Sequence, residues 1–232
     1  MAKLTVHHLQ VGQGERIPFL LEELGIPYEL KLYQRDPFFS PPELKEKHPI
    51  GASPLLEDAT SDSEHPILLA ESGAIVDYII NKYGDSRLAI PSSHPNYADY
   101  LYWLHFSNGN LQPTLFRRFQ ARMLVSDQQD PRYQGADERV QRALKHMNER
   151  LASNEYLAGS EFTAADIMSV WCLTTMRKFE PIDLTGYTAI LAWLKRVTKR
   201  PGYQTAMKKS DPELDLEAGI SVQGPPPFAP KK

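Results

Sequence analysis

Two short motifs in the first third of the chain bring together residue types that could hold a small charged molecule. They are Ser53-Pro54 and Glu71-Ser72. Proline cannot donate to a sheet ladder, so Pro54 is expected at the first position or edge of a strand, and in a tight turn it can be cis. Glu71 and Ser72 are expected to begin a helix, adding a carboxylate and a hydroxyl to its exposed backbone donors. Such a corner suits a zwitterion, whose ammonium group would meet the carboxylate and whose carboxylate would meet the hydroxyl and the amides.

The elements around these motifs follow the order strand, helix, strand, strand, strand, helix. From alternating and helical apolar spacing we expect strands at 3–9, 28–33, 54–57 and 67–69, helices at 15–24 and 71–83, and one helical turn at 42–47. Gly25 is a natural stop for the first helix. The first strand–helix–strand group implies a parallel pair of strands. This order is the thioredoxin-like layout, so the fold class expected here is α/β.

The chain becomes purely helical after a linker that begins at Gly84. Helices are expected to start near Tyr97, to cover 136–151, to start at Thr163 and to cover 187–197. Pro113 should kink the first of them, and Thr163 with Asp166 forms a variant of the capping box. Arg200-Pro201 is expected to end the last helix. The proline-rich stretch 224–232 is expected to be disordered or draped over the surface.

Ser53-Pro54, Glu71-Ser72 and the order of elements together resemble the glutathione transferases, over nearly the whole chain. The resemblance implies a thioredoxin-like glutathione-binding domain followed by an all-helical substrate and dimerisation domain. The implied boundaries are 1–84 for the first domain, 85–95 for the linker, 96–210 for the second domain and 211–232 for a proline-rich tail. It also implies that Ser53 and Pro54 present a backbone edge, across a cis bond, to the cysteinyl unit of glutathione. Glu71 and Ser72 would then hold the γ-glutamyl end.

A glutathione transferase must convert the glutathione thiol into the nucleophilic thiolate near neutral pH. The family usually supplies a Tyr, Ser or Cys donor just after the first strand. The stretch 7–17 of this chain is most similar to fungal and bacterial members, yet Gly12 stands where the active-site serine would be, and Gly14 replaces a second serine. The usual hydroxyl mechanism is therefore in doubt for this chain.

A helix N-terminus is the remaining device for stabilising the sulfur. Backbone amides near Gln13 and Gly14 could face it, and the side-chain amide of Gln13 or Gln10 could donate a hydrogen bond. Glu15 would oppose a thiolate, and Arg16 would offset Glu15 if it turned inward. We expect Gln13 and Gly14 to be the catalytic residues, while a role for Gln13 as an ordinary exposed loop residue stays open.

The glycyl carboxylate of glutathione needs a cation or a donor from the second loop. Arg35, Lys45 and His48 are the candidates, and we favour Arg35 and His48. Many relatives carry a lysine at the position of Ala52, so that contact is missing here. His48 could equally be an ordinary surface histidine.

The second substrate is expected against the first helix of the helical domain. The residues expected to form its wall are Tyr100, Trp103, Phe106 and Asn110. Aromatic residues in such a helix more often belong to the core, so a packing role stays open for them. Because the family is generally homodimeric and this helix has two apolar faces, a homodimer is expected.

Composition restricts the other functions. The chain has 232 residues and a net charge of -3, which favours neither nucleic acid nor an anionic membrane as a partner. It has no apolar run near the roughly 20 residues that span a bilayer. The only cysteine, Cys172, lies in an apolar helical run and is expected to be inert core, which together with the lack of disulfides favours the cytoplasm. His7 and His8 should point to opposite faces of a strand, so no metal is expected.

The leading interpretation is a glutathione transferase that adds the glutathione thiolate to a hydrophobic electrophile, as in detoxification, or reduces organic peroxides. The main alternative is a non-catalytic glutathione-binding or protein-interaction module of the same fold, and the missing hydroxyl at Gly12 is its support. A third possibility is the transferase-like domain of a translation factor or synthetase complex. We expect that less, because the chain ends soon after the helical domain.

Overall fold

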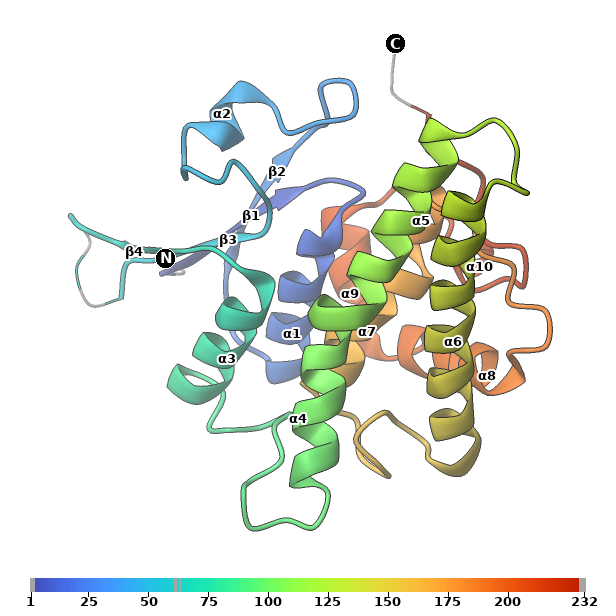
Figure 1. Ribbon diagram of the computed structural model, residues 1–232. Coiled ribbons are helices and arrows are strands. Elements are labelled where there is room, and N and C mark those ends of the chain that lie inside the picture. Colours follow the sequence, from blue (N-terminus) through green and yellow to red (C-terminus); the bar gives the residue numbers. More distant parts are fainter. Residues whose placement is uncertain (1–2, 61, 63, 230–232) are drawn as a thin grey trace. The chain divides into compact units, whose positions relative to one another are not determined.

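The computed structural model describes the chain except for residues 1–2, 61, 63 and 230–232. The chain forms two compact units. The first contains 1–89 and 198–214, and the second contains 90–197 and 215–228. Figure 1 shows all labelled strands in the first unit and helices α4 to α8 in the second. The expected fold class, a thioredoxin-like domain followed by a helical one, is therefore confirmed.

A four-stranded mixed sheet forms the centre of the first unit. Its strands are β1 (Leu4–Leu9), β2 (Glu29–Tyr33), β3 (Leu55–Asp58) and β4 (Ile67–Leu69), in the order β2-β1-β3-β4. β1 runs parallel to β2, and the β1–β3 and β3–β4 pairs are antiparallel. In the middle of the sheet Val6 lies between Leu30 and Leu56 and is fully buried. All four strands occur where the alternating pattern predicted them, to within one residue at each end.

The helices of the first unit are α1 (Arg16–Leu24), α2 (Pro42–Lys45), α3 (Ser72–Lys82) and α9 (Pro201–Ser210). A short 3-10 turn, Gln13–Glu15, leads into α1, and Gly25 ends α1 in the left-handed conformation with φ 67°. α9 packs along α1, where the rings of Phe19 and Tyr203 meet edge to face at 5.1 Å.

α8 ends at Thr198, just before Arg200-Pro201 where the sequence predicted its end, and Pro201 then begins a further helix, α9, that was not predicted. Proline suits the first turn of a helix, where its missing N–H group has no intrahelical acceptor anyway. The expected boundary of the helical domain at 96–210 therefore differs from the contacts of the chain, which group 198–214 with the sheet.

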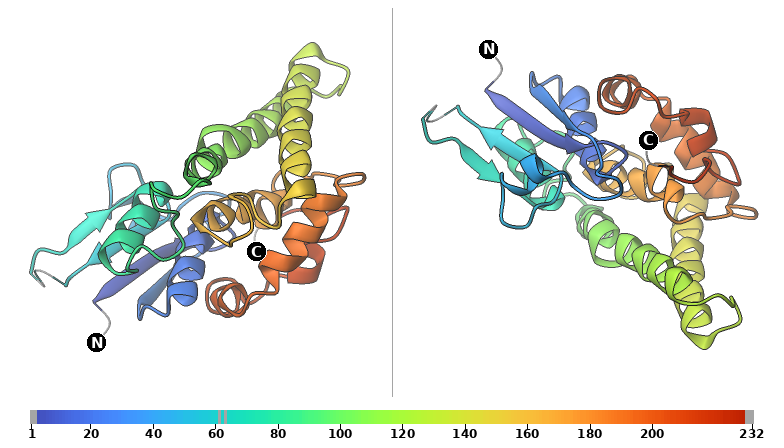
Figure 2. Two further views of the ribbon diagram at one scale, coloured as in Figure 1. Left: turned by 90° about the horizontal axis from the view of Figure 1, so that it is seen from below. Right: turned by 90° about the horizontal axis from the view of Figure 1, so that it is seen from above.

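The second unit contains α4 (Tyr97–Phe106), α5 (Gln112–Leu124), α6 (Pro131–Ser153), α7 (Ala164–Leu173), α8 (Thr188–Thr198) and the short α10 (Leu216–Gly219). A π-helical segment, Ser107–Leu111, joins α4 to α5, and Pro113 lies in the first turn of α5. The irregularity expected at Pro113 therefore occurs just before it, as a widened turn. Figure 2 shows α5 and α6 side by side, joined by a loop.

Helix α7 is the core helix of the second unit, as its apolar residues predicted, and all ten of its residues are buried. The capping box is also confirmed: Thr163 accepts from the N–H of Ala165, and Asp166 accepts from the N–H of Thr163 at 3.0 Å. Asp166 additionally accepts from Leu157 N–H at 3.0 Å and from the indole N–H of Trp193 at 2.8 Å. One carboxylate therefore ties three segments of this unit together.

Residues 215–228 of the expected proline-rich tail belong to the second unit, whereas 211–214 belong to the first. The buried guanidinium of Arg177 donates to the carbonyl oxygens of Gly219, Ser221 and Val222, and burial lowers its pKa to about 10. Phe228 N–H donates to Lys178 O at 2.8 Å. Residues 230–232 of the expected tail lie outside the described residues.

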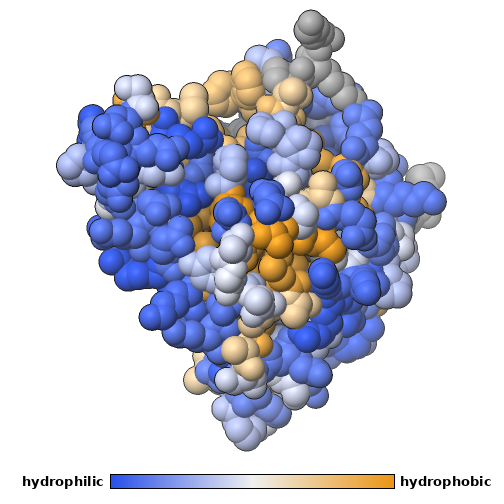
Figure 3. Space-filling view, turned by 90° about the vertical axis from the view of Figure 1, so that its right-hand side faces the viewer, coloured by the Kyte–Doolittle hydropathy of each residue, from blue (hydrophilic) through white to orange (hydrophobic). Residues whose placement is uncertain are grey.

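Polar residues dominate the surface drawn in Figure 3, and a group of hydrophobic residues lies near its middle. In the second unit the exposed large apolar side chains include Phe116, Met123 and Leu124. Among the described residues, no helix has the length and apolarity that a membrane span requires.

Candidate functional site

The Ser53-Pro54 corner lies at the start of β3, where the bond between the two residues is cis. Ser53 is 8% exposed, and its hydroxyl accepts from Leu9 N–H at 2.9 Å and donates to His7 O at 3.3 Å. These two bonds fix the corner against the end of β1. The side chain of Ser53 is therefore used to hold the corner, and what the corner offers to a ligand is its backbone.

The Glu71-Ser72 corner forms the N-terminus of α3. Glu71 is the N-cap residue, with φ 69° and ψ 112°, and makes no side-chain capping hydrogen bond. For a residue with a Cβ, positive φ costs on the order of 1–3 kcal/mol and persists only where the surroundings enforce it. Ser72 is buried, and Glu71 is exposed. The expected acid and hydroxyl therefore occur together at a helix N-terminus, where the first turn has backbone N–H groups without intrahelical acceptors.

Arg16 connects the two corners from beneath. Its side chain is fully buried at the start of α1, and one Nη1 donates to Gln13 Oε1 at 3.1 Å and to Ser72 Oγ at 3.2 Å. Gln13 Nε2 in turn donates to Ser53 O at 3.1 Å. A hydrogen-bonded chain thus runs from Ser53 through Gln13 and Arg16 to Ser72. The sequence analysis expected Arg16 to offset Glu15 only if its side chain turned inward. In the structure the Arg16 side chain is fully buried.

The loop between β1 and α1, which leads to Gln13 of these hydrogen bonds, has a strained backbone. Val11 has φ 54°, a genuine outlier for a β-branched residue. Asp211 Oδ1 accepts from Val11 N–H at 2.7 Å, and Arg35 donates to Val11 O at 2.8 Å and to Gln10 O at 3.2 Å. Two opposite charges therefore hold the peptide groups on either side of the strained residue.

The structure leaves no room for a side chain at Gly12 or Gly14, the two positions where the resemblance implies serine. A Cβ on Gly12 would lie 2.8 Å from Leu9 O, and a Cβ on Gly14 would lie 2.5 Å from His8 Nδ1 and 2.7 Å from Ser53 Oγ. Such approaches are too close for any side chain. The loop is packed so tightly against β1 and the Ser53 corner that neither position has room for a hydroxyl-bearing side chain.

The residues expected to meet the glycyl carboxylate occupy the second loop and α2. The guanidinium of Arg35 donates to the backbone carbonyls of Gln10, Val11 and Phe38, the last at 2.7 Å. Burial lowers the pKa of Arg35, and the nearby carboxylate of Asp211 opposes this shift. His48 is half-buried and accepts from Ile50 N–H at 3.3 Å, and Lys45 packs along Gly51.

The residues expected to form the wall for a second substrate lie on α4 and the π-helical segment. Tyr100, Trp103 and Phe106 are buried, and Asn110 is exposed. The ring of Trp103 stacks on His146 of α6 at 5.0 Å and meets Phe106 at 4.9 Å. These contacts are those of packing within the second unit, and the expected role as a substrate wall stays a prediction.

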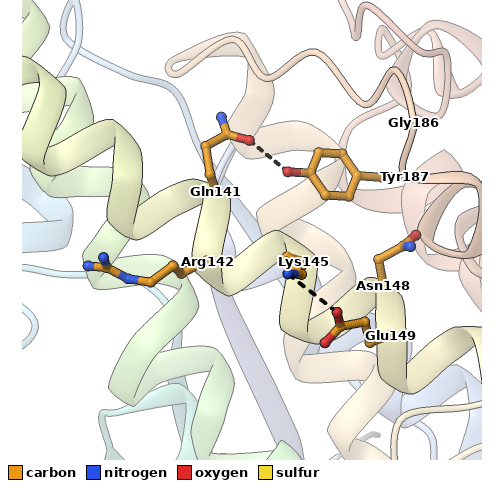
Figure 4. A pocket seen from close by; sticks show the side chains of 7 residues that line it. All are labelled: Gln141, Arg142, Lys145, Asn148, Glu149, Gly186 and Tyr187. Carbon is orange, nitrogen blue, oxygen red and sulfur yellow. Dashed lines mark hydrogen bonds and ion pairs between the residues drawn. The ribbon is translucent and has the colours of Figure 1, made fainter.

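A pocket of about 470 Å³ lies on the second unit, and none of the residues that line it belongs to the expected site (Figure 4). It is lined by Gln141, Arg142, Lys145, Asn148, Glu149, Gly186 and Tyr187. Tyr187 donates to Gln141 at 2.6 Å, Lys145 lies 3.8 Å from Glu149, and Asn148 accepts from the N–H groups of Ala189 and Ile190 at the start of α8.

His7 and His8 point to opposite faces of β1 and have different partners. His7 lies 3.1 Å from Glu57 and 2.8 Å from the hydroxyl of Tyr33, whereas His8 Nε2 lies 2.7 Å from Asp211. Within the described part of the chain, no group of three or more His, Cys, Asp or Glu side chains could hold a metal ion.

Sequence reasoning missed Asp211 and the burial of His8. Asp211 follows α9 and is 203 residues away from His8 along the chain, so no local pattern connects the two. Its position two residues before the acidic Glu213 and directly before Pro212 reads as an ordinary helix end. Only the packing of α9 on α1 brings this carboxylate to the loop.

Comparisons with known proteins identify the family of the chain. The model of the glutathione S-transferase N-terminal domain matches residues 5–81, and that of the C-terminal domain matches residues 111–201. Glutathione S-transferase 3 of Schizosaccharomyces pombe is 29% identical, with 98% of this chain and 96% of the relative covered. Glutathione S-transferase 1 of Saccharomyces cerevisiae is 31% identical, with 89% of this chain and 95% of the relative covered.

A solved structure extends the likeness to the fold. A glutathione S-transferase from Actinobacillus pleuropneumoniae superimposes with a TM-score of 0.80 at 28% sequence identity, covering 92% of this chain and 95% of that one. With both domain models matched in the expected order and a 31% identical relative covered almost in full, the chain belongs to the glutathione S-transferase family.

Proposed function

We propose that the protein binds glutathione between the Ser53–Pro54 and Glu71–Ser72 corners, and that it transfers the glutathione thiolate to an electrophile or uses it to reduce organic peroxides. The observation that carries the proposal is the hydrogen-bonded chain through Gln13 and Arg16 that joins the two corners. It connects two motifs that lie about 20 residues apart in sequence.

The γ-glutamyl end of glutathione is a zwitterion, and the Glu71–Ser72 corner matches its charges. The exposed carboxylate of Glu71 would take the ammonium group. The glutamyl carboxylate would take the Ser72 hydroxyl and the first-turn amides of α3, which Glu71 does not cap. The buried charge of Arg16, 3.2 Å behind Ser72 Oγ, adds to the attraction for this carboxylate.

The cysteinyl unit would lie along the backbone of Ser53, with its sulfur above the start of α1. The backbone amides of Gln13 and Gly14, at the start of the 3-10 turn, would stabilise the thiolate. The side-chain amide of Gln13 is anchored at both ends, to Ser53 O and to Arg16. Gln13 would therefore act chiefly by fixing the turn.

The reaction follows from the thiolate. In conjugation the sulfur forms a bond to an electrophilic carbon, and a leaving group departs with the electron pair of the bond that breaks. With a hydroperoxide the sulfur attacks one peroxide oxygen, the O–O bond breaks, and the alkoxide takes a proton to become an alcohol. The sulfenic acid of glutathione then condenses with a second glutathione to give the disulfide and water.

The outer parts of the site complete the proposal. His48 is the better-placed partner for the glycyl carboxylate, since Arg35 already donates to three backbone carbonyls and would contribute through its charge. Tyr100, Trp103, Phe106 and Asn110 remain the proposed wall for a hydrophobic electrophile. A cytoplasmic homodimer that acts in detoxification is the setting we propose for this activity.

Binding is tested by calorimetric titration of reduced glutathione into the wild type, Glu71→Ala and Ser72→Ala. Each substitution removes one polar partner of the bound zwitterion and should weaken binding by roughly 1–3 kcal/mol, about 5- to 150-fold. Glu64→Ala and Ser92→Ala replace exposed residues of the same types elsewhere and should bind like the wild type. Unchanged affinity in both Glu71→Ala and Ser72→Ala would refute the site.

The alternative of a non-catalytic glutathione-binding or interaction module is supported by Gly12 and Gly14, which supply no hydroxyl where the resemblance implies serine. The ultraviolet difference spectrum of the protein with glutathione at neutral pH separates the two functions. A thiolate band supports the transferase. Saturable binding of glutathione without such a band would establish the module instead.

A further inference from the structure

The strained backbone at Val11 needs a cause, because nothing in its own sequence favours the left-handed conformation. A β-branched residue rarely adopts φ 54°, and it does so here between Gln10 and Gly12, at the entrance to the turn that leads into α1. Such conformations persist where the surroundings over-determine them, and they gather at functional sites. Two side chains distant in sequence supply that constraint.

Asp211 holds the loop from one side. Its Oδ1 accepts from Val11 N–H at 2.7 Å, and its Oδ2 lies 2.7 Å from His8 Nε2. Asp211 is 4% exposed and His8 is fully buried, so neither contact is shared with bulk water. Charge-assisted bonds of this length are about twice as strong as neutral ones. The Asp211 carboxylate thus contacts both the loop and His8 of β1.

Arg35 holds the loop from the other side. Its Nη2 and Nε donate to the carbonyl oxygens of Val11 and Gln10 at 2.8 and 3.2 Å. The N–H of Val11 is therefore bonded to an anion and its C=O to a cation, a polarised arrangement that fixes both peptide planes around the strained residue. A loop held in this way has little freedom to shift its amides.

The end of α9 is itself firmly placed. Gln10 Nε2 donates to Ser210 O at 3.0 Å, next to Asp211. At the other end of α9, its N-cap residue Arg200 forms an ion pair with Glu23 of α1 through two hydrogen bonds, at 3.1 and 2.6 Å. The Arg200 ion pair therefore holds the N-terminal end of α9 on α1, while the bonds of Gln10 and Asp211 hold its C-terminal end at the loop.

His8 extends the constraint to the turn. A Cβ on Gly14 would lie 2.5 Å from His8 Nδ1, so the imidazole fits between the Asp211 carboxylate and the Cα of Gly14. With no space for a hydroxyl at Gly12 or Gly14, the position of the backbone amides decides how well a sulfur is stabilised there. A displacement of about 1 Å in such a group can cost a factor of 10² in rate.

We propose that Asp211 is a positioning residue, which together with Arg35 holds the loop 10–14 in the strained conformation that directs the amides of Gln13 and Gly14 toward the glutathione sulfur. The inference rests on the proposed function. It assigns a role in thiol activation to a residue at the end of α9 that itself does not touch glutathione. The reaction site is thereby made dependent on the segment that follows the helical part of the chain.

The test compares Asp211→Asn with the wild type by ultraviolet titration of bound glutathione and by steady-state kinetics with 1-chloro-2,4-dinitrobenzene. Asp211→Asn keeps the shape of the side chain and removes its charge. We expect the pKa of the bound thiol to rise by about 1 and kcat to fall roughly tenfold, while the Kd for glutathione changes less than about threefold. Asp211→Glu, which restores the charge, should recover part of the loss.

Two further variants separate positioning from simple stability. Arg200→Ala breaks the anchor of α9 on α1 without touching the loop, and it should lower the melting temperature while the thiol pKa stays as in the wild type. Val11→Gly, which accepts φ 54° without strain, should restore part of the kcat lost in Asp211→Asn. If Asp211→Asn does not fold, Arg35→Lys is the second variant. It replaces the guanidinium that bonds to Gln10 O and Val11 O with a single ammonium group, and it should produce the same rise in thiol pKa.

The outcomes are distinct. A folded Asp211→Asn variant with wild-type thiol pKa and kcat would overturn the positioning role and leave the transferase proposal intact. An equal rise in thiol pKa in Arg200→Ala would also overturn it, because general loosening of α9 would then explain the effect. A wild type that binds no glutathione, or binds it only as the thiol, would overturn both proposals.

Discussion

One helix N-terminus in each unit combines an acidic and a hydroxyl side chain, but only one of the two is capped by these side chains. Helix α7 begins after Thr163, whose side chain and that of Asp166 satisfy the backbone donors of its first turn. Helix α3 begins after Glu71, also an acid next to a hydroxyl residue, yet Glu71 makes no capping bond and has φ 69° rather than the φ −137° of Thr163. The first N-terminus is closed by its own side chains, and the second presents its donors and its carboxylate outward.

The difference shows how the same chemistry serves folding in one unit and binding in the other. At α7 the side chains of Thr163 and Asp166 bond to backbone N–H groups at the start of the helix, which is buried and apolar. At the corners of the first unit the chain accepts strain at Glu71 and Val11 and inserts a buried charge, Arg16, whose bonds run along the site. Local rules of helix capping are broken where a ligand is expected, as is usual for functional sites.

The largest effect is expected from opening the closed N-terminus. Asp166→Ala removes the acceptor for Leu157 N–H, Thr163 N–H and Trp193 Nε1, and leaves these donors buried. We expect a loss of about 3 kcal/mol or more in the free energy of unfolding, measured by urea denaturation. Asp130→Ala, which removes the exposed cap of α6, should cost only about 1 kcal/mol. Equal losses would show that burial does not distinguish the two caps.

A smaller effect is expected from crowding the open site. Gly14→Ala places a methyl group 2.5 Å from His8 Nδ1 and 2.7 Å from Ser53 Oγ, so the loop must move. We expect a stability loss of about 1–3 kcal/mol, with weaker glutathione binding in calorimetry. Gly135→Ala in α6 meets no atom within 4 Å and should be neutral or slightly stabilising. Wild-type affinity in Gly14→Ala would mean that the loop is not packed against the Ser53 corner during binding.

The response to pH should also differ between the units, because two buried carboxylates have pKa values shifted in opposite directions. Burial is the largest influence on both. For Asp166 it prevails and raises the pKa to about 6. For Asp58, at the end of β3, hydrogen bonds from Thr60, Tyr83, Tyr78 and Lys82 together outweigh burial and hold the pKa well below its usual range.

The signs follow from linkage. Between pH about 4 and about 6 the folded state binds the Asp166 proton more tightly than the unfolded chain, so this group makes the second unit more stable as the pH falls. Asp58 contributes stability above pH about 4 that is lost as the pH falls further. Hydrogen exchange followed from pH 6 to pH 3 should show the sheet of the first unit opening before α7. Simultaneous loss of protection in both would contradict the assignment.

Much of this molecule can be predicted from sequence, and the rest fails for one physical reason. Alternating and helical apolar spacing locates β1 to β4 and α7, because each must bury one face or all of its surface. The motifs at Ser53 and Glu71 can be recognised because their chemistry is local. The carboxylate of Asp211 cannot, because its meeting with His8 depends on how α9 packs, which no local pattern records.

Pro201 shows the same limit in a single residue. Proline both ends and begins helices, and only the apolar residues that follow, here buried as Tyr203, Ala206 and Met207, decide between the two. Arg16 shows it for charge: its sequence position allows a surface role, while the structure buries it completely between Gln13 and Ser72. Residues with two permitted roles are therefore assigned by tertiary contacts.

The smallest effect is expected at Gln13, and it bears most directly on how an open helix N-terminus works without a hydroxyl. If Gln13 fixes the turn through Ser53 O and Arg16, Gln13→Ala should lower kcat about threefold to tenfold and change the Kd for glutathione less. Turnover with 1-chloro-2,4-dinitrobenzene and calorimetry measure the two quantities on the same preparation. Gln10→Ala, which removes a side chain bonded to Ser210 O instead, is the matched comparison. An unchanged kcat in Gln13→Ala would leave the backbone amides, held by Asp211 and Arg35, as the groups that act on the sulfur.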